Sequence, residues 1–198
     1  AIADDMLTGL AGNDTLTGLD GDDILDGGDG TDTLIGGDGN DIYYADDVDT
    51  ITETSTGGFD IVITNDDYEM DANVEAIIYN GYAANPGSQA HFAKGNTISN
   101  LMIGGNLDNE MAGNTGTDVL YGAEGDDYLW GGTGTDTAIY TGEYSSYTVN
   151  ATANTVDDGT DTDTLHANME YTKFADGTVD MSTGTFTATN WNNDTSTT

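Results

Sequence analysis

The sequence predicts an all-β protein in which short parallel strands stack into a solenoid, and three observations predict it. A nine-residue unit recurs without a break from Gly9 to Tyr44. Each of these units has glycine at its first and fourth places and a large apolar residue at its eighth. The same unit returns after Gly95. A fixed short period with glycine punctuation is typical of repetitive, coiled chains.

The first array, residues 1–44, contains the units GLAGNDTLT, GLDGDDILD, GGDGTDTLI and GGDGNDIYY. Its glycines permit positive φ and close backbone approach, so about six residues of each unit form a turn and about three form a strand. The large eighth residue then points inward. Two units make one coil of 18 residues, and successive coils bury a thin apolar core that a single coil cannot bury alone. Because the chain opens partway through a unit, we expect it to be part of a longer protein.

The intervening segment, residues 45–94, loses the period but keeps strand-forming sequence. DVDTITE (47–53), FDIVIT (59–64) and NVEAIIYNG (73–81) are rich in β-branched and apolar residues, which predicts further strands that extend the same sheet. Pro86 lies in a predicted loop.

The second array, residues 95–140, contains GNTISNLMI, GGNLDNEMA, GNTGTDVLY, GAEGDDYLW and GGTGTDTAI. Its first two units carry Asn100 and Asn109 at the sixth place, where the other units carry Asp. The last unit has only Ala138 at the eighth place, which indicates that the array ends there.

The remaining sequence predicts a cap and a tail. Residues 141–181 are rich in aromatic and β-branched residues, and a solenoid needs a terminal cap, so we expect β-strands with a hairpin turn at Asp176–Gly177. Residues 182–198 are rich in Thr and Asn, and we expect a flexible end or the start of a linker.

The composition restricts the partners. The chain has 37 acidic residues, two lysines and a formal charge of −35, so we expect no nucleic-acid partner and no adsorption to anionic lipid. No run approaches the roughly 18 apolar residues of a membrane-spanning helix. So dense a negative charge destabilises a compact state by self-repulsion unless it is neutralised. The chain has no cysteine to form stabilising disulfides, and a divalent cation is the simplest neutralising group.

The aspartates of the repeats fit calcium, which binds six to eight oxygen ligands from carboxylates and carbonyls. In coils of 18 residues, sixth-place residues of alternate units lie above one another. An ion between two coils would therefore contact the sixth-place side chains of both. The strong pairs are Asp5–Asp23, Asp14–Asp32, Asp23–Asp41 and Asp118–Asp136. Pairs Asn100–Asp118 and Asn109–Asp127 are weaker, because an amide oxygen carries no charge. We therefore expect several calcium ions, at least four.

Units such as GGDGTDTLI, GGDGNDIYY, GAEGDDYLW and GGTGTDTAI resemble the RTX family of haemolysin-type calcium-binding repeats. The resemblance spans roughly residues 1–181, although the nonapeptides are its only specific motif. It implies a parallel β-roll with calcium in the turns, and a secreted or cell-surface bacterial protein exported by type I secretion.

The resemblance also implies the ligands: carbonyls at the first, third and fifth places and the side chain at the sixth. The carbonyls belong to Gly9, Ala11, Asn13, Gly18, Asp20, Asp22, Gly27, Asp29, Thr31, Gly36, Asp38, Asn40, Gly113, Thr115, Thr117, Gly122, Glu124, Asp126, Gly131, Thr133 and Thr135. The side chains belong to Asp5, Asp14, Asp23, Asp32, Asp41, Asn100, Asn109, Asp118, Asp127 and Asp136. We expect the side chains of Asp20, Asp22, Asp29, Asp38, Glu124 and Asp126 to point into solvent. Leu10 and Leu19, at the second place, should matter little.

No catalytic constellation is recognisable. His91 and His166 lie in no metal-ligand spacing, and neither a GxSxG motif nor a phosphate-binding loop is present, so we expect no enzymatic activity. Trp130 and Tyr44 occupy the ninth place and should face outward or lie at an edge. Glycan binding through exposed aromatic residues is a weaker alternative.

The leading hypothesis is a calcium-binding structural module of a surface-layer protein or adhesin, which folds and self-associates in extracellular calcium. The alternative is the non-catalytic C-terminal part of a secreted hydrolase or polysaccharide-modifying enzyme.

Overall fold

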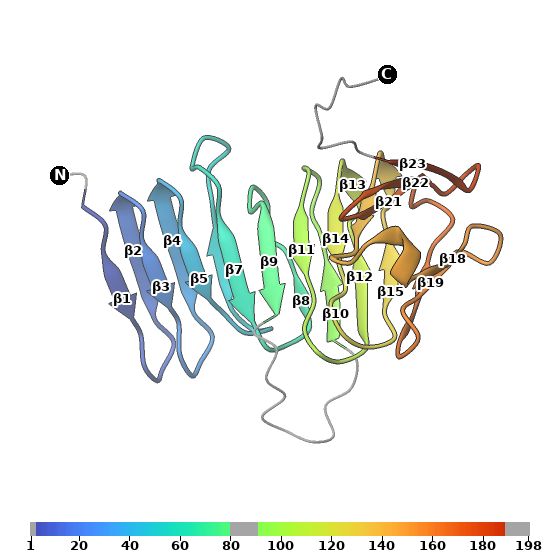
Figure 1. Ribbon diagram of the computed structural model, residues 1–198. Helices are drawn as coiled ribbons and strands as arrows, with labels where there is room; N and C mark the ends of the chain where they lie inside the picture. Colours follow the sequence, from blue (N-terminus) through green and yellow to red (C-terminus); the bar gives the residue numbers. More distant parts are fainter. Residues whose placement is uncertain (1–2, 80–90, 189–198) are drawn as a thin grey trace.

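The computed structural model describes residues 3–79 and 91–188. These residues form an elongated parallel β-solenoid, with the strands lying side by side along one axis from the N-terminal end to the cap (Figure 1). The predicted fold class is confirmed. In the described ranges, no helix is long and apolar enough to cross a membrane.

One face of the solenoid is a continuous sheet of 11 strands. In spatial order these are β1 (Met6–Thr8), β3 (Ile24–Asp26), β5 (Ile42–Tyr44), β7 (Ile61–Thr64), β9 (Ala76–Tyr79), β11 (Leu101–Ile103), β14 (Val119–Tyr121), β17 (Thr137–Ile139), β21 (Tyr171–Phe174), β22 (Gly177–Asp180) and β23 (Thr185–Ala188).

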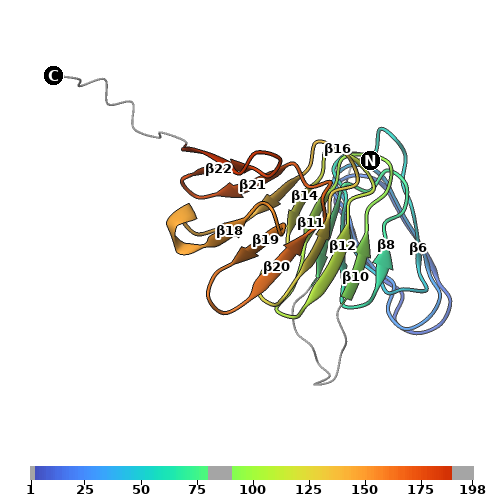
Figure 2. The same cartoon turned by 90° about the vertical axis from the view of Figure 1, so that its right-hand side faces the viewer.

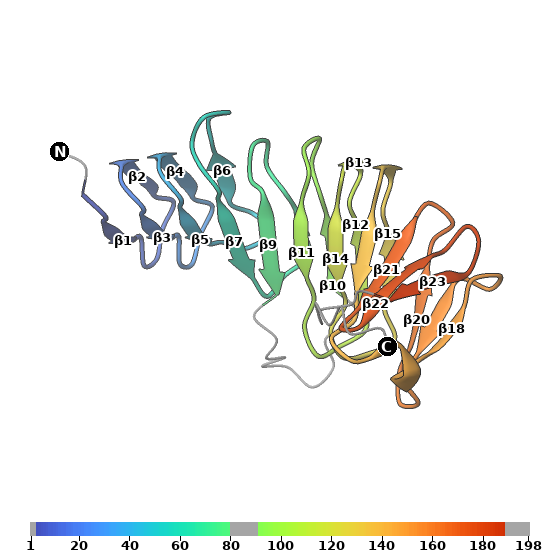
Figure 3. The same ribbon diagram turned by 45° about the horizontal axis from the view of Figure 1, so that its top comes forward.

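The opposite face is interrupted (Figure 3). Its first sheet is β2 (Thr15–Asp20), β4 (Thr33–Asp38) and β6 (Thr50–Thr52). Its second sheet is β18 (Thr148–Asn150), β19 (Thr155–Asp157), β20 (Thr162–Leu165), β15 (Tyr128–Trp130), β12 (Asn109–Ala112), β10 (His91–Lys94) and β8 (Tyr68–Glu69). Strands β6 and β8 belong to different sheets, so the sheet on this face breaks within the intervening segment.

The register shows the predicted coil length in both arrays. Met6 pairs with Ile24 and Ile24 with Ile42, and Leu101 pairs with Val119, each 18 residues apart. Between the arrays the spacing changes, and Ile61 pairs with Ala76. Coils of several lengths therefore stack on one continuous sheet. In the turns of the second array, β13 (Thr115–Gly116) pairs with β16 (Thr133–Gly134).

The core is a single file of eighth-place side chains between the two faces. The fully or almost fully buried members are Leu25, Leu34, Tyr43, Met102, Met111, Leu120, Leu129 and Ala138, and this inward orientation confirms the prediction. The intervening segment adds Val62, Val74 and Ile77, all fully buried. Full burial of such a side chain contributes about 1.5–3 kcal/mol, so the file of apolar residues is a major source of stability.

The cap differs from the arrays because its strands turn antiparallel (Figure 2). Strands β18–β20 extend one face and β21–β23 extend the other. A 3₁₀ turn, η1 (Tyr144–Ser146), lies between β17 and β18. Tyr140, Tyr147 and Phe174 pack together, with ring centroids 5.1–5.4 Å apart. These aromatic rings close the end of the apolar file.

Two expectations for the cap need correction. The tight turn between β21 and β22 is Ala175–Asp176, because Gly177 already pairs with Phe174. Residues Thr185–Ala188, expected in a tail, form strand β23 and pair with β22, since Phe186 packs against the hydrophobic core. Residues 189–198 and the predicted loop at Pro86 lie outside the described residues.

Candidate metal centres

The sixth-place aspartates form hydrogen-bonded rows along the solenoid. In each row, one carboxylate oxygen accepts the backbone N–H of the residue one coil earlier. The N–H of Asp14 donates to Asp32 Oδ1 at 2.7 Å, and that of Asp118 donates to Asp136 Oδ1 at 2.8 Å. Asp5 with Asp23 and Asp23 with Asp41 show the same bond, at 2.7 and 2.8 Å. The structure thus brings together all four strong pairs.

The other carboxylate oxygen in these rows has no protein partner. Oδ2 is buried and without a hydrogen bond in Asp14, Asp23, Asp32, Asp41, Asp60, Asp118, Asp127 and Asp136. A buried, ionised oxygen without a partner is costly, and native proteins rarely leave one. The repetition of the same orphaned atom in coil after coil indicates a cation as its partner.

In the repeats, these oxygens point toward the first-place glycines of their own turns. A Cβ added at Gly18 would lie less than 3.0 Å from both Asp23 Oδ2 and the Gly36 carbonyl oxygen of the next coil. A Cβ at Gly113 would similarly meet Asp118 Oδ2 and the Gly131 carbonyl oxygen. Carboxylate and carbonyl oxygens therefore border one small space, which glycine keeps open. This all-oxygen donor set fits calcium.

The third-place carbonyls are partly used within the protein. Those of Asp20, Asp29 and Asp38 accept backbone N–H groups from the preceding coil, at 2.8–3.2 Å. A carbonyl oxygen has two lone pairs, so one remains for a ligand. The other predicted carbonyls lie in or beside the same stacked turns: Gly9, Ala11, Asn13, Gly18, Asp22, Gly27, Thr31, Gly36, Asn40, Gly113, Thr115, Thr117, Gly122, Glu124, Asp126, Gly131, Thr133 and Thr135.

The acidic residues at the third and fifth places are all exposed, as predicted: Asp20, Asp22, Asp29, Asp38, Glu124 and Asp126. At the fifth place they also form an outer row. Asp22 Oδ1 accepts the N–H of Asn40 at 2.8 Å, and Asp126 Oδ1 accepts that of Thr162 at 2.6 Å. In the outer row the carboxylate belongs to the earlier coil and the N–H to the later one. The sixth-place rows have the reverse arrangement.

The two asparagines behave differently from the aspartates. Asn100 Oδ1 accepts the N–H of Asn96 at 2.9 Å, and Asn109 Oδ1 accepts that of Gly105, also at 2.9 Å. Each still donates its backbone N–H to the next carboxylate of its row, at 2.8 and 2.7 Å. Asn100 and Asn109 therefore donate into the rows without adding charge, and their amide oxygens are already engaged by N–H groups of their own turns.

Burial makes several of these carboxylates resist ionisation in the absence of a cation. It raises the pKa of Asp41 and Asp118 to about 6 and that of Asp127 to about 8, against an ordinary value of 3.8. The backbone N–H received by each carboxylate lowers its pKa but does not compensate. A bound divalent ion would favour the charged form.

The rows continue beyond the repeats through acidic residues that the nonapeptide pattern missed. The N–H of Asp32 donates to Asp49 Oδ1 and that of Asp41 to Asp60 Oδ1, each at 2.9 Å. Further members are Glu75, Asp163 and Glu170, which accept N–H groups from Asp60, Asp127 and Asp136 at 2.8–3.0 Å.

A sequence signal exists for four of these residues. Each stands two residues before a buried apolar residue, as the sixth-place aspartates do: Asp49, Asp60, Glu75 and Asp163. Their turns lack the full glycine pattern of the nonapeptide.

A family comparison agrees with this geometry. The family described as the RTX calcium-binding nonapeptide repeat (4 copies) matches residues 2–34, 20–50 and 103–138. The chain carries RTX repeats. Its RTX calcium-binding nonapeptide repeats form a β-solenoid, as the resemblance predicted. The matched residues lie within the two predicted arrays and the start of the intervening segment. A search of curated proteins found no matching relative.

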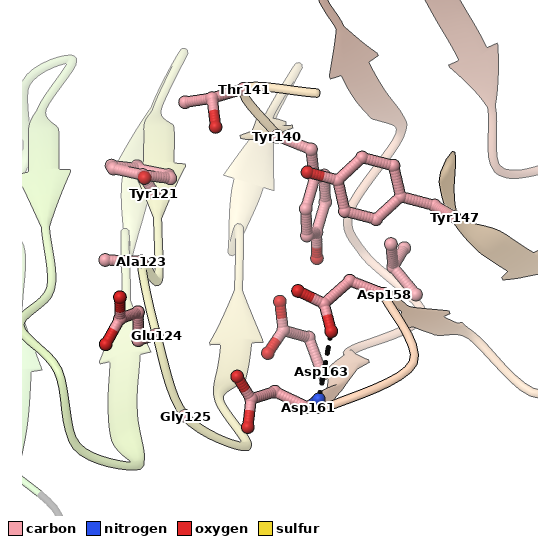
Figure 4. A pocket seen from close by; sticks show the side chains of 11 residues that line it. Tyr121, Ala123, Glu124, Gly125, Tyr140, Thr141, Tyr147, Asp158, Asp161 and Asp163 are labelled. Carbon is pink, nitrogen blue, oxygen red and sulfur yellow. Dashed lines mark hydrogen bonds between the residues drawn. The ribbon is translucent and has the colours of Figure 1, made fainter. Parts of the chain in front are cut away.

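The structure also has a cleft between the second array and the cap. In Figure 4, Tyr140 and Tyr147 lie near Asp158 and Asp161, whereas Tyr121 lies across the cleft. Asp158 Oδ1 accepts the N–H groups of Thr160 and Asp161, at 2.8 and 3.0 Å, and bonds with Thr160 lower its pKa. Within residues 3–79 and 91–188, this cleft holds no close cluster of three carboxylates.

The aromatic residues of the repeats are divided between the core and the surface. Tyr43 is fully buried, whereas Tyr44 is 42% and Tyr128 52% exposed. Trp130 is half-buried and stacks on Tyr128, with centroids 5.8 Å apart. Tyr44 thus faces outward as expected, and Trp130 lies on the surface beside Tyr128.

Proposed function

We propose that this RTX solenoid is a structural module that folds on extracellular calcium in a secreted or cell-surface bacterial protein. The observation that carries the proposal is the repeated, buried and unpartnered Oδ2 of the row aspartates. The chain has a charge of −35 and two lysines, and Lys94 pairs with Glu69 at 3.1 Å on the surface. Protein cations therefore do not neutralise the rows.

The same charges make folding of the module depend on calcium. At low cytosolic calcium, repulsion among carboxylates opposes the compact state and keeps the chain open, which suits type I secretion. Extracellular modules bind calcium at about 10⁻⁴–10⁻³ M, so ions outside the cell stabilise the fold by mass action. We propose at least four ions, one for each strong aspartate pair.

We propose that the parent is a surface-layer protein or adhesin and that the module is not an enzyme. The exposed third-place and fifth-place acids support this, because two copies of such a negative surface repel each other unless cations bridge them. The second candidate is the non-catalytic RTX part of a secreted hydrolase. It rests on the family resemblance, and a catalytic motif in the adjoining sequence of the parent protein would favour it.

Circular dichroism of calcium-free protein during titration with calcium, with magnesium as control, tests the calcium dependence of folding. We expect β-structure to develop at millimolar calcium, together with binding of at least four ions in equilibrium dialysis. An unchanged spectrum would remove the proposal. Electron microscopy tests the surface-layer role: we expect ordered sheets in calcium and none in chelator, and a monomer at high protein and calcium concentrations contradicts it.

A further inference from the structure

Three carboxylates gather where the first array meets the intervening segment. One oxygen from each of Asp41, Glu53 and Asp60 lies within 4.8 Å of the other two. All three residues are buried, with exposed fractions of 0, 8 and 0%. Asp41 is the sixth-place residue of the last unit of the first array, whereas Glu53 and Asp60 lie between the matched residues 20–50 and 103–138 of the family comparison.

We infer that Asp41, Glu53 and Asp60 form an additional calcium site, built on a side chain that the nonapeptide repeat does not supply. The inference rests on the proposed function, since it assumes that the rows bind calcium. It assigns Glu53 as a carboxylate ligand that the repeat pattern does not contain.

Unpartnered atoms point into this cluster. Asp41 Oδ2 and Asp60 Oδ2 are both buried without a hydrogen-bond partner. A Cβ added at Gly36 would lie less than 3.0 Å from Asp41 Oδ2, Glu53 Oε1 and the Tyr43 hydroxyl. Oxygens from different coils thus converge on the space above a glycine, as they do in the repeat turns.

Hydrogen bonds fix the carboxylates of Asp60 and Glu53 and leave them acceptor capacity for a cation. Asp60 Oδ1 accepts the N–H of Asp41 at 2.9 Å. Glu53 Oε1 accepts the Tyr43 hydroxyl and the N–H of Gly37, and Oε2 accepts the N–H of Thr54 at 3.0 Å. A carboxylate has about four lone-pair sites, so Glu53 retains acceptor capacity. Tyr43 stands at an eighth place where Leu25 and Leu34 stand in earlier units, and its hydroxyl orients Glu53.

The charge of the cluster requires a counter-ion. Three ionised carboxylates this close, in a buried site, repel strongly unless a cation compensates them. Lys94 is engaged with Glu69, and Lys173 lies in the cap strand β21. Calcium accepts several carboxylates in flexible geometry, whereas magnesium keeps most of its waters, so the cluster favours calcium.

The location gives the ion a structural role. Glu53 directly follows β6, the last strand of the three-stranded sheet, whereas Asp41 and Asp60 directly precede β5 and β7 on the continuous face. A cation here ties the two faces together where one sheet ends. It therefore holds the intervening segment in register with the first array.

The test compares Glu53→Gln with Glu110→Gln, which makes the same change at an exposed position in β12, by equilibrium dialysis and isothermal titration of the full chain with calcium. We expect E53Q to bind one ion fewer, or to bind one ion at least tenfold more weakly, and E110Q to match the wild type. Tyr43→Phe should weaken the same ion several-fold.

Equal stoichiometry and affinities for E53Q and wild type overturn the inference. If circular dichroism shows that E53Q does not fold in saturating calcium, Asp60→Asn is judged by the same criterion, because Asn retains an acceptor for the Asp41 N–H. A wild-type chain that binds no calcium would instead overturn the proposed function, so the two failures are distinguishable.

Discussion

The backbone N–H of Asp23 donates to Asp41 Oδ1 at 2.8 Å across one coil, while Asp41 Oδ2 is buried and unpartnered. One carboxylate thus has two functions on its two oxygens. The first oxygen fixes the stacking of successive coils, and a hydrogen bond to a charged group contributes about 1.5–3 kcal/mol. The second oxygen is left for a cation. Substitutions that preserve one function and remove the other can separate them.

Asp32→Asn is the first such substitution. The amide oxygen still accepts the Asp14 N–H, but the negative charge at the ion is lost. We expect calcium affinity at this site to fall at least tenfold, or about 1.4 kcal/mol, as measured by isothermal titration. Asp29→Asn is the control, because it removes the same charge from an exposed third-place side chain. Equal losses in both variants would indicate general charge screening and contradict the prediction.

Gly18→Ala tests the space that the first-place glycines keep open. The new Cβ would lie less than 3.0 Å from Asp23 Oδ2 and the Gly36 carbonyl oxygen. We expect loss of the ion there, seen as reduced calcium stoichiometry in equilibrium dialysis. Gly159→Ala supplies the comparison, because Gly159 has a φ of 95° with nothing near its Cβ position. That variant should lower stability while its calcium stoichiometry stays at the wild-type value.

The arrays were predictable from the sequence because their geometry repeats. A period of nine residues with glycine at fixed places determines the 18-residue coil, and the coil determines that Asp14 meets Asp32 and that Leu25 and Leu34 point inward. Each step needs only local backbone geometry and the two-unit coil.

The continuation of the rows was not predictable from the nonapeptide pattern. Asp49 follows Asp32 by 17 residues, Asp60 follows Asp41 by 19, and Glu75 follows Asp60 by 15. The hydrogen bond requires only a carboxylate at the end of a turn, so turns of other lengths and without the glycines can make it. Glu170 is further away still, because the cap inserts strands between it and Asp136.

Leu10 and Leu19 provide a prediction about stability. From the sequence we expect leucine at these second places to matter little, yet both residues adopt a left-handed backbone, with φ of 77° and 84°. Their side chains are 73% and 67% exposed, so they contribute little packing. Because left-handed backbone costs a side-chain-bearing residue about 1–2 kcal/mol, Leu10→Gly and Leu19→Gly should each stabilise the calcium-bound fold by about 1 kcal/mol after the entropic cost of glycine.

Urea unfolding in saturating calcium measures this effect. Gly28→Ala should act in the opposite direction, because Gly28 has a φ of 88° and its Cβ would meet the Leu10 carbonyl group. Unchanged or lowered stability in both leucine variants would show that the left-handed conformation carries no strain at these positions.

The raised pKa values predict an unusual pH dependence for the calcium-free chain. Burial raises the pKa of Asp60 to about 7 and that of Asp127 to about 8, from an ordinary value of 3.8 that applies in the unfolded chain. At pH values between 3.8 and about 7–8, the folded state therefore binds more protons than the unfolded state. Protonation therefore stabilises the calcium-free fold, and this contribution is complete below the unfolded pKa and is lost as pH rises through about 7–8.

Circular dichroism of dialysed, calcium-free protein should accordingly show more β-structure at about pH 5 than at about pH 8. In subsaturating calcium the dependence should reverse, because protons compete with the ion for the same carboxylates. Asp127→Asn keeps the acceptor for the Asn109 N–H and removes the titrating group, so it should reduce the acid stabilisation of the calcium-free chain. Calcium-free protein that loses structure steadily between about pH 8 and pH 5 would contradict the assignment of buried, proton-binding carboxylates.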